Sequence, residues 1–146
     1  MPTPSFSSDR DIDRIGRGVL DRSLPKPEWT HAAHFAATLW LLRHRPDLDL
    51  PREMPVLIRA YNEATGLANT DTQGYHNTIT QASLRAACAH LAGYPSTAPL
   101  HQVANDLMAS ELGRSDWLLI YWSRPRLFCV EARRAWIDPD LKPLPF

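Results

Sequence analysis

The segment Trp29-Thr30-His31-Ala32-Ala33-His34 opens the stretch around which the rest of the chain is organised. Thr30 precedes a run of strong helix formers, and a threonine side chain can accept hydrogen bonds from the first free N–H groups of a helix. The pattern therefore predicts a helix over 31–44. This helix should end before Pro46, because a residue that precedes proline avoids helical backbone angles.

The two histidines of this segment lie three positions apart, so both imidazoles face the same side of the predicted helix. On a helical wheel this side also carries Thr38, Leu41 and Leu42. Because most of these neighbours are apolar, His31 and His34 should point inward. Imidazoles in such a place need a polar partner, since burying a polar group without a hydrogen bond is costly.

Composition limits the classes of protein to consider. A chain of 146 residues fits one domain and can bury a substantial core. Its formal net charge is zero and its basic residues are dispersed, which argues against a nucleic-acid surface and a polybasic membrane surface. The longest unbroken apolar run, 117–122, is too short to span a bilayer. We therefore expect a small-molecule ligand or another protein as partner, with no nucleic acid and no membrane.

The cysteines and the N-terminus indicate the compartment. Cys88 and Cys129 are far apart, and each lies in an apolar helical context. This usage is typical of reduced thiols in a protein core, not of a disulfide framework. Residues 1–10 lack the apolar segment of a signal peptide. Together these features predict a cytoplasmic protein.

Apolar residues recur at helical spacing along most of the chain. Residues 1–8 are rich in proline, serine and threonine, which predicts a flexible N-terminus ahead of one helical domain over 9–146. Besides 31–44, helices are expected at 9–20, 52–64, 75–91, 99–110, 115–122 and 123–136. The predicted fold is all-α: a single-domain irregular bundle of about six to seven helices with an extended proline-rich C-terminal tail.

The predicted helix 75–91 supplies a second group of polar residues. One side of it carries His76, Thr80 and Ser83, which are small or polar. An inner face with so little bulk predicts a pocket or a close contact between helices. His76 stands at the start of this face, next to the polar loop 66–74.

If the helices 31–44 and 75–91 pack side by side with their N-termini at the same end, His31, His34 and His76 could converge. Three imidazoles that leave a coordination position open can bind a divalent transition metal, and the set suits zinc, iron, copper or nickel. Asp71, in the polar loop, could then act as a general base or orient a ligand. The first hypothesis is therefore a metal-dependent enzyme acting on a small polar or acidic molecule.

Other interpretations of the same residues stay open. An H-x-x-H pair arises readily by chance in a chain with six histidines, and this pair lacks the glutamate of the H-E-x-x-H metalloprotease motif. Asp71 fits an Asx turn better than a catalytic role. Without a metal, the histidines and the free N–H groups of two helix N-termini could receive an anion. The second hypothesis is a non-catalytic ligand-binding or protein-interaction module.

The C-terminal third offers further interpretations. Arg126, Arg133 and Arg134 could attract an anion, although a solvated charged face is the commoner outcome. Trp117 and Trp122 could pack in the core or at the interface of a homodimer. The third hypothesis is a structural subunit that docks a partner through this aromatic region.

The chain also resembles a set of small bacterial all-helical proteins of no established activity. The likeness rests on Trp29-Thr30-His31-Ala32-Ala33-His34, on Tyr75-His76-Asn77-Thr78-Ile79-Thr80 and on the ending 136–145. It covers most of the chain from residue 24 onward. Such sequences often have glutamate where this chain has Asn77. The resemblance implies a helical fold and no particular activity, and any function of that glutamate would be missing here.

Overall fold

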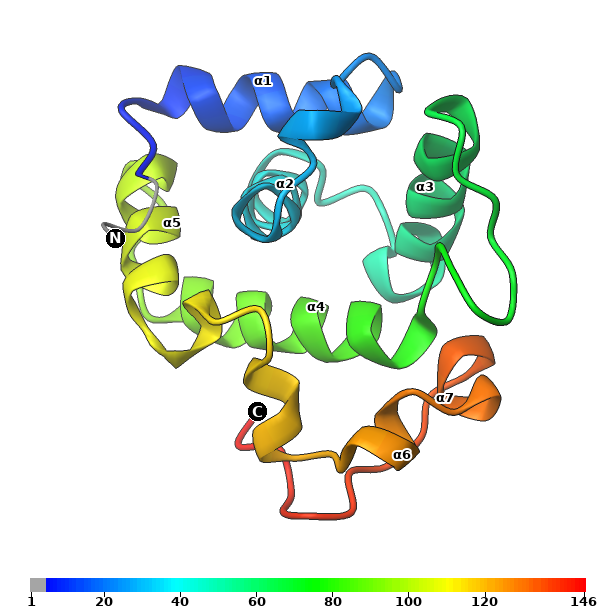
Figure 1. The fold of residues 1–146 in the computed structure, drawn as a ribbon. Coiled ribbons are helices and arrows are strands. Elements are labelled where there is room, and N and C mark those ends of the chain that lie inside the picture. The colour runs from blue at the N-terminus through cyan, green and yellow to red at the C-terminus, as the bar shows by residue number, and fades with distance from the viewer. Residues whose placement is uncertain (1–4) are drawn as a thin grey trace.

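Five α-helices of ten or more residues form the body of the protein. The computed structural model describes residues 5–146, and within this range it contains no β-strand. The five helices are α1 (Asp9–Leu20), α2 (His31–His44), α3 (Leu50–Ala64), α4 (Asn77–Ala92) and α5 (Leu100–Ala109). In Figure 1, α1, α3, α4 and α5 surround α2, which is seen nearly end-on. The prediction of an all-α fold is confirmed.

The central position of α2 follows from its composition. Nine of its 14 residues are buried, among them Phe35, Leu39 and Trp40. A helix that is apolar around most of its circumference is stable only when other elements cover it. Its predicted limits are confirmed, and so is its cap, because the backbone N–H of Ala33 donates to Oγ1 of Thr30 at 3.2 Å.

A glycine allows α1 to pack closely against α2. A Cβ atom placed on Gly16 would lie 2.4 Å from Cδ2 of Trp40, closer than non-bonded carbon atoms approach. On the same helix, Asp13 accepts a hydrogen bond from Nε1 of Trp40 at 3.0 Å. The glycine that weakens α1 as an isolated helix is therefore required where the two helices meet.

Several helix boundaries differ from the prediction. α3 begins at Leu50 and not at 52, with Pro51 in its first turn, where the missing N–H of proline does no harm. α4 begins at Asn77 and not at 75, because His76 caps it. The free thiols also differ in position, since Cys88 is exposed on α4 and not buried in the core.

The largest departure from the prediction lies after residue 113. Where one helix was expected over 115–122, the structure has only a 3-10 turn, Trp117–Ile120. The expected helix 123–136 is divided into α6 (Arg124–Leu127) and α7 (Val130–Arg134). Cys129 divides them: its backbone is extended (φ −74°, ψ 161°), and its Sγ accepts a hydrogen bond from the N–H of Ala132 at 3.4 Å.

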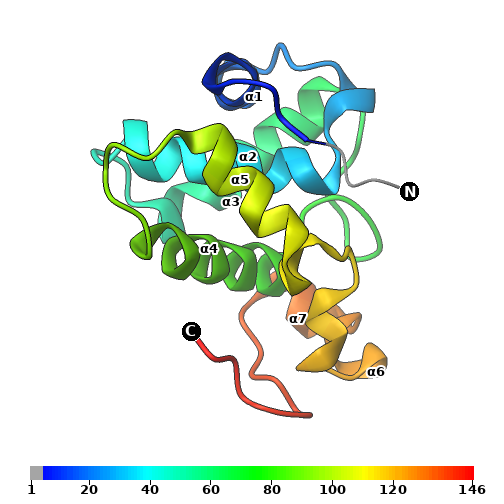
Figure 2. The same cartoon turned by 90° about the vertical axis from the view of Figure 1, so that its left-hand side faces the viewer.

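The segment from residue 115 onward lies against the outer side of α4. Figures 1 and 2 both show it, in orange to red, on the side of α4 opposite to α2. Two hydrogen bonds hold the chain end in place: the side-chain Nε1 of Trp122 donates to the carbonyl of Ile137 at 2.9 Å, and the backbone N–H of Leu141 donates to the carbonyl of Tyr121 at 2.9 Å.

The N-terminal residues were expected to be flexible over 1–8, and residues 1–4 of this stretch lie outside the described range. Phe6 exchanges two hydrogen bonds with the side chain of Asn105 on α5, at 2.8 and 3.0 Å. Among the helices of residues 5–146, none has both the length and the apolar character needed to cross a bilayer.

Candidate functional site

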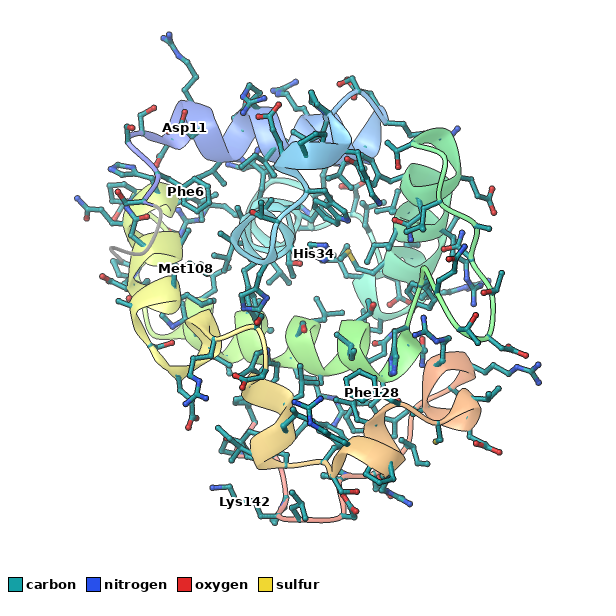
Figure 3. All side chains as sticks on the ribbon, in the orientation of Figure 1. Phe6, Asp11, His34, Met108, Phe128 and Lys142 are labelled. Atoms are coloured by element: carbon teal, nitrogen blue, oxygen red, sulfur yellow. The ribbon has the colours of Figure 1, made fainter. Side chains whose placement is uncertain are left out.

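A cavity of about 520 Å³ lies between α2, α3, α4 and the segment 115–128. Its volume falls in the range of small-molecule pockets, roughly 300–1,000 Å³. His31, His34 and His76 all line it. Figure 3 shows His34 on the side of α2 that faces α3. The three histidines singled out from the sequence therefore share one cavity.

Most of the cavity wall is apolar. The apolar lining residues are Trp29, Phe35, Met54, Ile58, Leu67, Tyr75, Ile79, Trp117, Leu118, Leu119, Leu127 and Phe128. The polar residues, besides the three histidines, are Lys26, Thr38, Asn62, Thr80, Ser83, Ser115, Asp116 and Arg124. An apolar wall with a few polar groups is typical of a site for a small organic molecule.

His76 has a structural role at the start of α4. Its Nδ1 accepts a hydrogen bond from the N–H of Ile79 at 3.2 Å, and its Nε2 lies 2.7 Å from the carbonyl oxygen of Leu127. A neutral imidazole offers one acceptor and one donor, so Nε2 carries the proton and both nitrogens are used. Burial lowers the pKa of His76, which keeps it in this neutral form.

One ring nitrogen of His31 is also hydrogen-bonded to the backbone. Its Nε2 lies 2.8 Å from the carbonyl oxygen of Leu112, and a carbonyl can only accept, so Nε2 donates. The ring meets Phe35 edge to face, with centroids 5.3 Å apart. His31 therefore ties the first turn of α2 to the turn that follows α5.

His34 is different, because no hydrogen bond joins its ring to another described residue. One face of the ring stacks on the indole of Trp29, with centroids 3.7 Å apart and planes inclined by 25°. The His34 side chain is exposed, and the surface that it exposes lines the cavity. Reduced hydration at this position lowers its pKa from 6.5 to about 3, and the positive charge of Lys26 acts in the same direction. His34 is thus a neutral imidazole at ordinary pH.

The three histidines do not form a metal-ligand set as they are arranged. Within residues 5–146 no group of three or more His, Cys, Asp or Glu side chains is placed to hold a metal ion. His76 uses both ring nitrogens on the backbone, and His31 uses one. Figure 1 gives the reason: α2 is seen end-on while α4 runs across the picture, so the helices cross and do not lie side by side. The metal cofactor stays a prediction that this arrangement does not support.

Asp71, the candidate general base, lies outside the lining of the cavity. Its two carboxylate oxygens accept hydrogen bonds from Nε and Nη2 of Arg134 at 2.9 and 2.6 Å. These bonds lower the pKa of Asp71, so the carboxylate stays ionised and paired. The geometry gives it no access to a molecule in the cavity.

The three arginines of the C-terminal segment hold loops in place and do not collect around one point. Arg126 donates to the carbonyl of Asp138 at 2.6 Å. Arg133 donates to the carbonyls of Gly74 and Tyr75 at 3.2 and 3.3 Å, and Arg134 pairs with Asp71. The arginine that lines the cavity is a fourth one, Arg124.

Three lining residues, Lys26, Arg124 and Phe128, were not among the candidates that the sequence offered. Lys26 belongs to the proline-rich link before α2, while Arg124 and Phe128 belong to the divided C-terminal helix. No local pattern marks these positions, because long-range packing brings them to α2. Comparison of the chain with protein-family models, curated proteins and solved structures gave no match.

Proposed function

We propose that this protein is a binding module for a small organic molecule, which occupies the cavity between α2, α3, α4 and the segment 115–128. The observation that carries the proposal is His34, a neutral imidazole that lines the cavity and has no hydrogen-bond partner among the described residues. A neutral imidazole offers one donor and one acceptor to a bound molecule. The apolar wall supplies contact area, and His34 supplies orientation.

The same observations favour binding over catalysis. A general base works best when its pKa lies near the working pH, and the pKa of His34 is lowered to about 3. Asp71 is paired with Arg134 away from the cavity. The hypothesis of a ligand-binding module therefore has more support than that of a metal-dependent enzyme.

The test is saturable binding of a neutral apolar dye, phenylnaphthylamine, whose emission rises in apolar surroundings. We expect saturation in the wild type. Ser83→Phe, which fills part of the cavity, should weaken binding by at least about tenfold, or ~1.4 kcal/mol. Ser83→Ala, which adds no bulk, should bind at least as well as the wild type.

Two further variants control for effects away from the cavity. Val56→Phe places the same aromatic ring on a residue that is 64% exposed on α3, and Asp71→Asn changes a residue outside the lining. Both should bind like the wild type. The proposal fails if the wild type shows no saturable binding, or if Ser83→Phe, folded by circular dichroism, binds as tightly as Val56→Phe.

A further inference from the structure

The side chains that line the cavity carry an excess of positive charge. Lys26 and Arg124 both line it, and neither forms an ion pair with a described residue. The acidic lining residue, Asp116, is neutralised by Arg114, with Nε and Oδ1 3.2 Å apart. The chain as a whole has a formal net charge of zero, so this excess of positive charge is local. A cavity with uncompensated cations favours a negatively charged ligand.

The surroundings of His34 agree with this charge. The charge of Lys26 opposes protonation of His34, so Lys26 is close enough to act on a charge placed at the ring. An anionic group beside His34 would experience the same field with the opposite sign, as an attraction. It could also accept a hydrogen bond from the imidazole N–H.

The apolar lining is rich in flat side chains. Trp29 already stacks on one face of His34 with ring centroids 3.7 Å apart, so this part of the wall is built from parallel rings. Phe35, Tyr75 and Phe128 add further aromatic surface to the lining. Phe128 is 54% exposed, so a molecule bound against it would bury apolar surface that is open in the free protein. Aromatic walls favour planar ligands through stacked or edge-to-face contacts.

We infer that the ligand of this cavity is a planar aromatic anion, whose rings contact the aromatic wall while its anionic group is attracted by the cations of the lining, Lys26 and Arg124, and can accept a hydrogen bond from the N–H of His34. The inference deepens the proposed function and rests on it. It names the ligand by chemistry: a carboxylate, sulfonate or phosphate on an aromatic ring system.

A matched pair of dyes tests the charge. Anilinonaphthalene sulfonate and phenylnaphthylamine share one ring system and differ by the sulfonate. We expect the sulfonate to bind at least about tenfold more tightly to the wild type. Lys26→Gln and Arg124→Gln should each reduce this preference several-fold, because the preference is the ratio of the two affinities and glutamine removes the charge while keeping a polar side chain. Lys142→Gln and Arg52→Gln, which remove cations outside the cavity lining, should leave the preference unchanged.

Displacement of the bound sulfonate dye tests the planar part of the inference. We expect naphthoate to displace it at lower concentration than decanoate, an anion with a flexible aliphatic chain. If decanoate competes as well as naphthoate does, the aromatic assignment is wrong. If both dyes bind equally well and Ser83→Phe blocks both, the charge assignment is wrong and the binding function stands. If neither dye saturates, the binding function itself is overturned.

Discussion

The imidazole of His34 lies against the indole of Trp29, with ring centroids 3.7 Å apart. This contact joins the link before α2 to the first turn of that helix. It also places a fluorophore directly on the one cavity histidine whose ring makes no hydrogen bond to a described residue. Protonation of His34, or binding of a molecule beside it, can therefore be followed by the fluorescence of Trp29.

Acid should destabilise the protein through His34. Its pKa is about 3 in the folded state and near 6.5 when unfolded, so between these values the unfolded chain binds more protons. The free energy of unfolding should therefore fall as the pH is lowered from 6.5 towards 3. His34→Phe keeps an aromatic ring against Trp29 and removes the titrating group, so urea denaturation at a series of pH values should show a shallower decline. Identical slopes for the two proteins would contradict this prediction.

Loss of His76 should destabilise the start of α4. His76→Ala removes the cap on the N–H of Ile79, worth ~1 kcal/mol, and leaves the buried carbonyl of Leu127 without its donor, worth ~1–3 kcal/mol. His76→Asn can restore the cap but is too short to reach Leu127. Chemical denaturation should therefore place the asparagine variant between the alanine variant and the wild type. Equal stability of the two variants would show that the cap contributes nothing.

Gly16→Ala should be destabilising even though alanine is the better helix former. The gain in helix propensity is ~1 kcal/mol, whereas the new Cβ would overlap the Trp40 indole and force repacking at a cost of ~1–3 kcal/mol. In a Trp40→Leu background the clash is absent, and the same substitution should become stabilising. A double-mutant cycle measured by urea denaturation gives the coupling directly. Additive effects would exclude the close contact as the cause.

Thr78→Val should loosen the contact between α4 and the chain around α7. The Thr78 side chain is 0% exposed; its hydroxyl oxygen lies 2.7 Å from the carbonyl oxygen of Ala132 and accepts from the N–H of Ile137 at 3.2 Å. Valine has nearly the same shape but leaves these groups unpaired, so we expect a loss of ~1–3 kcal/mol in unfolding free energy. Thr72→Val, an exposed substitution in the loop, should leave the free energy of unfolding unchanged.

The parts of the fold that could be predicted are those determined by residues close together in the sequence. The limits of α2 follow from Thr30, from the helix formers after it and from Pro46, all of which act within a few residues. The division of the last helix could not be foreseen, because Cys129 reads as an ordinary apolar position in a periodic pattern. Its extended backbone and its Sγ cap appear only in three dimensions.

The candidate site was predictable in part for a similar reason. Helical spacing placed His31 and His34 on one inner side of α2, and they line the cavity together with His76. What each imidazole binds depends on carbonyl groups far away in the sequence: Leu112 lies 81 residues from His31, and Leu127 lies 51 residues from His76. No spacing rule reports such contacts, so the sequence left a metal site and a ligand pocket as open alternatives.

The cavity takes one of its walls from residues 115–128 and its other walls from α2, α3 and α4. During synthesis on the ribosome, α1 to α4 emerge well before this wall does. Closing the cavity then requires contacts between distant parts of the chain, which form slowly. An incomplete chain that ends before residue 115 would leave the outer side of α4 without its cover. Ligand binding would therefore distinguish chains that contain residues 115–128 from chains that end before them.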